Sequence, residues 1–192
     1  MCKFAKHLKM QKIKFYEEYI CKEEKMIILK EANINDVNKE YEAIKAIPEN
    51  ENGFENKYHN VTKEQFEKEV IPKLINNSKG LELKNGYVPC TYYFLWDDEK
   101  IVGLFKIRHF LNDFLKNGPG HIGYTILSEY RGKGYATAGL NLAIKECKKI
   151  IPEDEIYLSV LKTNEASLKV QLKCGAYKSG ETENDYLMRI KI

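Results

Sequence analysis

The sequence predicts one mixed α/β domain in which helices flank a central, largely antiparallel sheet. Short β-rich runs alternate with amphipathic helical segments along the chain. Two of these runs, 91–96 and 101–109, are joined by four polar residues, which is typical of an antiparallel hairpin. The chain has 192 residues, and this length suffices for one well-buried domain.

The domain is expected over residues 26–192, after an N-terminal extension. Residues 1–25 carry scattered lysines and a loose amphipathic pattern that permits a helix, but no continuous apolar stretch of a secretory signal. The apolar run 27–29 predicts the first strand. Apolar residues then recur at helical spacing from 34 to 47, and Pro48 ends that helix.

The next segment predicts a loop and a second helix. Residues 49–61 are polar and read as a loop. Thr62 and Gln65 have the spacing of a capping box, which marks the start of a helix. Pro72 is expected to kink this helix or to begin a new segment.

A strand, a glycine-rich basic turn and a helix follow one another in the second half of the chain. Apolar alternation over 122–126 predicts the strand, residues 131–134 (Arg-Gly-Lys-Gly) form the turn, and helical periodicity runs from 140 to 151. Glycines allow backbone N–H groups to approach phosphate oxygens. A helix N-terminus adds unpaired donors and the positive end of a dipole, so the segment predicts a phosphate site.

Further elements complete the predicted order β-α-α-β-β-β-α-β-α-β-β. Residues 110–119 read as a connection before the phosphate strand. After the phosphate helix we expect a strand at 156–161, a helix at 164–174, and strands at 176–181 and 185–191.

The sequence of this turn does not match either of two common nucleotide-binding motifs. It lacks the Ser or Thr that follows Gly-Lys in a P-loop, and it lacks the third glycine of a dinucleotide fingerprint. Residues 131–136 instead match the pattern Arg/Gln-x-x-Gly-x-Gly/Ala, and on this motif the chain resembles the GCN5-related N-acetyltransferase (GNAT) superfamily. Residues 164–176 are similar to the second motif of that family, with Asn164 as an N-cap and Gly175 as a C-cap.

The resemblance implies a GNAT fold and acetyl-CoA as co-substrate. It implies that the turn holds the pyrophosphate, mainly through backbone donors, and that the end of the preceding strand aligns the thioester and stabilises the oxyanion through a backbone N–H. Asn164 and Ser167 match positions that contact coenzyme A in relatives, although both would also serve simply to cap a helix. The implied cofactor residues are Ile126, Leu127, Ser128, Arg131, Gly132, Lys133, Gly134, Tyr135, Ala136, Asn164 and Ser167.

The sequence identifies the catalytic side chains less clearly than the cofactor-binding residues. His121 opens the phosphate strand and is the first candidate for the general base, with a strand-end structural role as the alternative. Glu129 and Tyr124 are weaker candidates, and a surface carboxylate is the favoured reading of Glu129. Relatives place a tyrosine, the acid for the leaving thiolate, seven residues after the capping Asn; here that residue is Gln171, which cannot act as an acid.

The predicted function is an N-acetyltransferase that moves the acetyl group of acetyl-CoA directly to a primary amine, without a covalent enzyme intermediate. Two alternatives remain: a non-catalytic module that binds or senses coenzyme A, and an acetyltransferase for protein N-termini or lysines. The acceptor, a small molecule or peptide, is expected to bind in the N-terminal half. Carboxylates in the loops either attract a cationic amine or are simply solvated; they are Glu49, Glu51, Glu55 and Asp113.

Composition restricts the kinds of binding partner and the cellular compartment that we expect for this protein. The net charge of +3 is small and the basic residues are interspersed with acidic ones, so no nucleic-acid partner is expected. No apolar stretch approaches the ~20 residues of a membrane span. The five cysteines lack metal-ligand spacing, so we expect no metal and a reducing cytoplasm. A homodimer is one arrangement that the resemblance implies.

Overall fold

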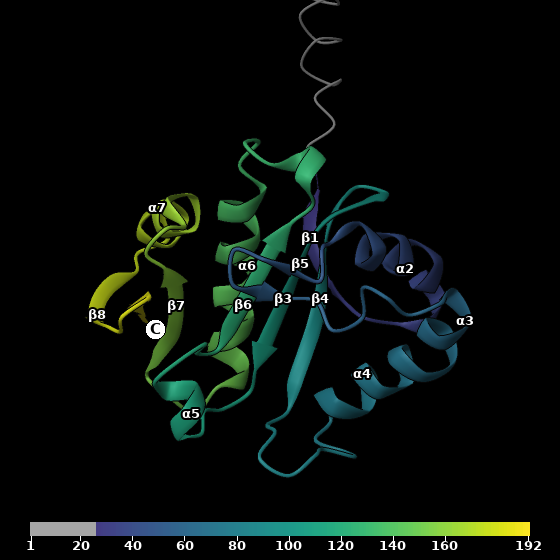
Figure 1. The fold of residues 1–192 in the computed structure, drawn as a ribbon, viewed down its shortest axis with the longest axis horizontal. Coiled ribbons are helices and arrows are strands. Elements are labelled where there is room, and N and C mark those ends of the chain that lie inside the picture. Colours follow the sequence, from purple (N-terminus) through teal and green to yellow (C-terminus); the bar gives the residue numbers. More distant parts are fainter. Residues whose placement is uncertain (1–25) are drawn as a thin grey trace, which may run out of the picture.

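A computed structural model describes residues 26–192 (Figure 1). The predicted N-terminal extension, 1–25, lies outside the described residues. The described part contains two larger antiparallel sheets rather than one continuous sheet, and a two-stranded hairpin. The first has the order β1-β4-β5-β6, formed by β1 (Ile27–Glu31), β4 (Cys90–Asp97), β5 (Lys100–Arg108) and β6 (Ile122–Ile126). The second has the order β7-β9-β8, formed by β7 (Glu155–Leu161), β9 (Asp185–Lys191) and β8 (Tyr177–Glu181).

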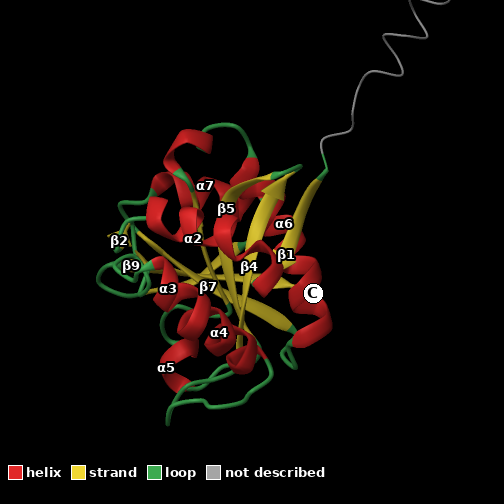
Figure 2. Cartoon of the chain, turned by 90° about the vertical axis from the view of Figure 1, so that its right-hand side faces the viewer, coloured by secondary structure: helices red, strands yellow, loops and turns green. Residues whose placement is uncertain are grey.

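Helices cover both faces of the first sheet. Helix α6 packs on β5 and β6, whereas α2 packs on β5 and α4 on β4. In Figure 1 the helices α2, α3 and α4 lie together on the right, and Figure 2 shows helices on both sides of the strands. The helices are α2 (Val37–Ala46), α3 (Lys63–Gln65), α4 (Ile71–Ser78), α5 (Asp113–Lys116), α6 (Tyr135–Ile150) and α7 (Glu165–Lys173). None of those in residues 26–192 combines the length and apolar composition that a membrane crossing requires.

Each face of the first sheet has its own apolar core. One core joins β4, β5 and β6 to α6 and to β7 and β9, with Phe105 and Leu140 among its fully buried members. The other joins the opposite face to α2 and α4, with Phe66 and Phe94 at its centre. Cys147 is fully buried on the inner face of α6 and belongs to the first of these cores.

The predicted strands and helices are confirmed, with three refinements. Thr62 and Gln65 form the expected capping box. After it comes a π-helical turn, η2 (Phe66–Val70), and α4 then begins with Pro72 in its first turn, where the missing N–H costs nothing. The loop 49–61 contains a small hairpin, β2 (Asn50–Glu51) and β3 (Phe54–Glu55), and the connection 110–119 contains α5.

Strands β6 and β7 meet at one point and then separate. They are connected by an isolated bridge between Gly120 and Leu158, and the N–H of His121 donates to the carbonyl of Tyr157 at 2.7 Å. Gly120 has φ +65°, and a Cβ there would lie 2.2 Å from the Tyr157 carbonyl oxygen, so only glycine permits this approach. Beyond the bridge, β6 has β5 as its only strand neighbour among residues 26–192.

Candidate active site

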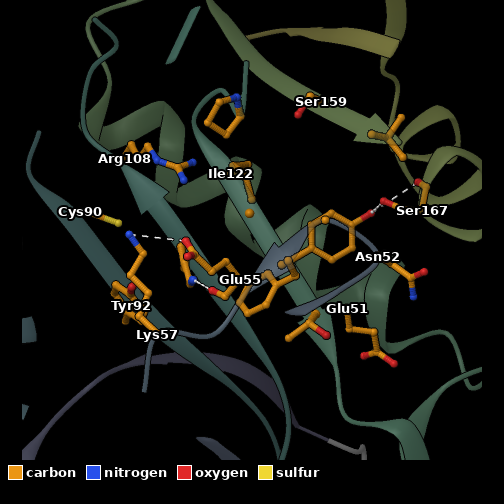
Figure 3. Close-up of a pocket in the computed structure, with 18 of the residues that line it drawn as sticks. Glu51, Asn52, Glu55, Lys57, Cys90, Tyr92, Arg108, Ile122, Ser159 and Ser167 are labelled. Carbon is orange, nitrogen blue, oxygen red and sulfur yellow. Dashed lines mark hydrogen bonds and ion pairs between the residues drawn. The ribbon is translucent and has the colours of Figure 1, made fainter. Parts of the chain in front are cut away.

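A cavity of about 1260 Å³ opens beside β6 and is lined by residues from both halves of the domain. Its cofactor end consists of the N-terminus of α6, the side chains of β6 and the start of α7. The other end, where the acceptor is expected and which we call the acceptor end, consists of the first residues of β4, the last residues of β5, the β2–β3 hairpin and the segment around α5. In Figure 3, Ser159 and Ser167 lie at the first end, and Cys90, Tyr92 and Lys57 lie at the second.

The N-terminus of α6 faces the cofactor end. Gly132 and Gly134 have φ of +74° and +86°, and both line the cavity. Gly134 is the N-cap of this 16-residue helix, and no side chain caps it. A Cβ at either glycine would meet nothing within 4 Å. The turn therefore presents open backbone and the positive end of a long helix dipole, an arrangement suited to an anion.

Arg131 has a structural partner. Its Nε donates to the carbonyl of Ile126 at 2.9 Å, and its two terminal nitrogens form a bidentate pair with Glu51 in the β2–β3 hairpin. This pair lowers the pKa of Glu51 and raises that of Arg131. Lys133 turns away from the cavity, and its Nζ donates to the carbonyl of Glu129 at 2.9 Å. Arg131 lines the cavity with its charge already paired to Glu51, and Lys133 lies outside the lining, so the open donors at the cofactor end are backbone N–H groups.

The backbone of β6 alternates between β5 and the cavity. The N–H of Leu127 donates to Val102 O at 3.0 Å, and the carbonyl of His121 accepts from Arg108 at 2.9 Å. Because antiparallel pairs alternate, the N–H groups of Tyr124 and Ile126 point away from β5. The predicted thioester-aligning role is therefore available to Ile126, whereas the N–H of Leu127 is already bonded. Ser128 is exposed and lies outside the lining.

The start of α7 contributes two of the predicted residues. The Oδ1 of Asn164 accepts from the N–H of Ser167 at 3.0 Å, and its Nδ2 donates to the carbonyl of Asn52 at 3.3 Å. The Oγ of Ser167 lies 2.8 Å from the hydroxyl of Tyr124. Burial raises the pKa of Tyr124 to about 12, so its hydroxyl stays protonated at neutral pH. Asn164 therefore caps α7 and ties it to the β2–β3 hairpin.

Gln171 lies beside this pair. Its Nε2 donates to the carbonyl of Ser159 at 3.3 Å and lies 3.4 Å from the Oγ of Ser167. Its Oε1 is buried and has no hydrogen-bond partner within residues 26–192. Gln171 is 1% exposed and lines the cavity, so its Oε1 is a buried, unsatisfied acceptor in the cavity wall.

The comparisons with known proteins agree with this geometry. The model of the acetyltransferase (GNAT) family matches residues 56–176. The chain belongs to the GNAT acetyltransferase family. It is therefore an acyltransferase. A search of the curated proteins found no match.

Solved structures show the same fold at low sequence identity. A microcin self-immunity acetyltransferase in complex with acetyl-CoA and AMP is 17% identical, with a TM-score of 0.63 over 88% of this chain and 93% of that one. A ribosomal-protein alanine acetyltransferase from Vibrio fischeri is 18% identical (TM-score 0.61; 85% and 91%). A chimera of the spermidine N-acetyltransferase of Vibrio cholerae with hSSAT is 18% identical (TM-score 0.56; 86% and 95%).

Two predicted catalytic residues of this acetyltransferase lie outside the cavity lining. His121 is fully buried; its Nδ1 accepts from the N–H of Tyr157 at 3.0 Å, and its Nε2 lies 3.2 Å from Glu153. Burial lowers the pKa of His121, although Glu153 opposes this shift. With both nitrogens engaged, this geometry favours the structural role that the sequence left open over that of a general base. Glu129 is exposed on the short 3₁₀ turn η3 (Ser128–Tyr130).

The structure thus gathers most of the predicted cofactor residues of the acetyltransferase around one cavity. Lining residues are Tyr124, Ile126, Arg131, Gly132, Gly134, Tyr135, Ala136, Asn164 and Ser167. The sequence analysis missed Lys106 and Arg108, which line the acceptor end. A signal for both was present, since these two cations alternate with apolar residues at the end of a run that has no charged residue from 101 to 105.

Proposed function

We propose that this protein is an N-acetyltransferase that transfers the acetyl group of acetyl-CoA directly to the primary amine of a small acceptor. The observation that carries the proposal is the uncapped N-terminus of α6, which opens onto a cavity that continues to the acceptor end. One end suits the pyrophosphate of coenzyme A, and the other leaves room for an amine.

The residues present suit coenzyme A. Gly132 and Gly134 leave open space where a phosphate would approach the backbone of α6. Further along the cavity, the unpartnered Oε1 of Gln171 suits an amide N–H such as those of the pantetheine arm. The volume of about 1260 Å³ accommodates both an extended cofactor and a small acceptor.

The proposed chemistry needs no covalent enzyme intermediate. The acceptor nitrogen attacks the thioester carbonyl, and formation of the N–C bond gives a tetrahedral oxyanion. The amine proton passes to solvent, and the oxyanion collapses as the C–S bond breaks and coenzyme A leaves as the thiolate. We assign the N–H of Ile126, which points away from β5, to stabilising the oxyanion. Since neither His121 nor Glu129 lines the cavity, neither has a role in this proposal.

We assign Tyr124 to the departing sulfur. Its hydroxyl lies beside Ser167 and lines the cavity close to Gln171, the residue that replaces the usual tyrosine. The raised pKa keeps the phenol protonated, so it can donate a hydrogen bond to the thiolate. Gln171 alone would favour a protein that binds coenzyme A without turnover, whereas Tyr124 supplies a phenol at the same place from β6.

The loops that border the acceptor end favour a small acceptor over a protein. Phe54 of the β2–β3 hairpin, Tyr58 of the loop after it and Phe114 of α5 line this end. We further propose a cytoplasmic location, because the cysteines in residues 26–192 are unpaired thiols. A homodimer remains an expectation, and size-exclusion chromatography with light scattering would test it.

Thiol release from acetyl-CoA across a panel of amines tests the function. Saturable release with one class of amine supports an enzyme, and coenzyme A binding without release from any member contradicts catalysis of the tested classes. Tyr124→Phe should lower kcat about 10- to 100-fold with little change in the KM for acetyl-CoA. Tyr177→Phe is the control, because Tyr177 lies on β8 and its hydroxyl donates to Glu155 outside the cavity. An unchanged kcat in Tyr124→Phe would remove Tyr124 from the mechanism.

A further inference from the structure

The floor of the acceptor end is formed by one face of β4 and β5. Cys90 pairs with Arg108 and Tyr92 pairs with Lys106 across the two antiparallel strands. Side chains of directly paired residues lie on the same face of a sheet, so these four face the cavity together. Figure 3 shows the guanidinium of Arg108 directed toward the middle of the cavity, from the side where Cys90 lies.

The charge at this end is predominantly positive. Cationic residues that line it are Lys57, Lys73, Lys84, Lys106 and Arg108. Three carboxylates line this end, and each has a partner. Glu55 lies 3.5 Å from Lys57, and Glu82 accepts from Asn76 at 3.1 Å. Glu51, once a candidate to attract a cationic amine, pairs with Arg131 instead. A cleft lined by one sign of charge concentrates ligands of the opposite sign.

Arg108 is held in place but not neutralised. Its Nη1 donates to the carbonyl of Gly120 at 2.9 Å, which orients the guanidinium. Within residues 26–192 it has no carboxylate at ion-pair distance. A guanidinium has five N–H donors in a planar fork, so the remaining donors match the oxygens of a carboxylate or phosphate.

Lys106 is a second cation without a carboxylate partner in the described part of the chain. Its Nζ donates to the backbone carbonyl of Glu55 and lies 4.2 Å from the ring centroid of Phe54 and 5.4 Å from that of Tyr92. Burial lowers the pKa of Lys106 to about 8. A charge that is costly to bury is stabilised by an anion in direct contact with it.

We propose that the acceptor of this enzyme is an amine that also carries an anionic group, a carboxylate or a phosphate, and that Arg108 and Lys106 bind that group. The inference rests on the proposed function, and it defines the class of the acceptor. The anionic group binds on the floor while the amino group is directed along the cavity toward β6. A polyamine brings only like charges to this floor and is disfavoured there.

Inorganic phosphate tests the anion site without relying on turnover. We expect calorimetry on protein saturated with coenzyme A to show saturable phosphate binding in the millimolar range. Arg108→Gln and Lys106→Gln should each weaken it at least tenfold, and Arg108→Lys should be intermediate because it keeps the charge but loses the fork. Lys100→Gln is the matched control, as Lys100 is an exposed lysine at the start of the same strand, outside the lining. Absence of phosphate binding to the wild type, or unchanged binding in both glutamine variants, would overturn the proposal.

Matched amines then test the acceptor class. Each pair differs in the anion alone: an α-amino acid with its amide, and an amino-sugar phosphate with the free amino sugar, together with spermidine. We expect one anionic member to have a kcat/KM at least tenfold above its neutral partner, and Arg108→Gln to remove most of this preference with an unchanged Kd for coenzyme A. A greater kcat/KM for spermidine or for the neutral partners would contradict the inference. Thiol release from no amine, alongside intact phosphate binding at Arg108, would count against the proposed function and not against the anion site.

Discussion

A charge placed at Gly134 should reveal whether the N-terminus of α6 holds the pyrophosphate. Gly134 has φ +86° and ψ −5°, and a Cβ built there meets nothing within 4 Å. Asn and Asp are the residues that best tolerate this left-handed region, and they have nearly the same volume. Gly134→Asn and Gly134→Asp therefore add the same bulk, and they differ in one negative charge.

The expected effects on folding and on binding differ in size. Left-handed strain costs about 1–2 kcal/mol, and a side-chain cap on α6 offsets up to about 1 kcal/mol of it. Both variants should thus have a Tm within a few degrees of the wild type. At a separation of roughly 5 Å and an effective dielectric constant of about 20, the carboxylate of Asp and one phosphate charge repel by about 3 kcal/mol. Coenzyme A should then bind to Gly134→Asp roughly 100-fold more weakly than to Gly134→Asn.

Calorimetric titration with coenzyme A measures this difference directly. Gly175 provides the control, because it has φ +88° and the same open surroundings but lies outside the cavity lining. Gly175→Asn and Gly175→Asp should bind coenzyme A equally well. The reasoning is refuted if the two Gly134 variants bind with the same Kd, or if the Gly175 pair differs as much as the Gly134 pair.

Three further predictions concern stability. The pKa of Glu51 is lowered by Arg131, so the pair stabilises the fold above the ordinary carboxyl pKa, and this contribution is lost as the pH falls through the lowered value. Glu51→Gln should cost a few tenths to about 1 kcal/mol at pH 7, and in urea denaturation its difference from the wild type should shrink as the pH is lowered. Glu40 is fully buried and burial raises its pKa to about 8, so the wild type should lose stability as the pH rises from 4.5 to 8. Glu40→Gln should be more stable than the wild type by on the order of 1–3 kcal/mol at pH 8. If the free energy of unfolding changes equally with pH in the two proteins, Glu40 does not titrate in the folded state. A Cβ at Gly139 would lie 2.4 Å from Cζ of Phe105. In Gly139→Ala the overpacking costs about 1–3 kcal/mol, which should exceed the gain in helix propensity of about 1 kcal/mol. A thermal melt of Gly139→Ala should therefore show a lower Tm than the wild type, and a higher Tm would mean that α6 moves to make room for the methyl group.

The cofactor end was largely predictable because its chemistry comes from contiguous residues. The strand, the glycine turn and the helix that form it follow one another between 122 and 150. Left-handed glycines and a helix N-cap are local features, which the identities of a few neighbouring residues define. The same reasoning placed Asn164 as the cap of α7.

Predictions that depended on hydrogen-bond direction or burial were less successful. The alternation of β6 was evident in the sequence, but which N–H groups face the cavity depends on the pairing with β5, and this pairing leaves Ile126 available and engages Leu127. His121 looked available at the start of a strand, yet the approach of β7 buries it between Tyr157 and Glu153. Neither neighbour is close to it in sequence.

By itself, the sequence determined the mixed α/β class, the order of the main elements and the phosphate turn, because each depends on periodicity or on a short motif. The tertiary structure alone decided the split into two sheets and the character of the acceptor end. Contacts between residues far apart along the chain form there when β4 and β5 pair beneath the β2–β3 hairpin: Lys106 with Glu55, and Arg108 with Gly120. Charge in a cavity depends on which side chains already neutralise one another, and that is a property of contacts between distant segments.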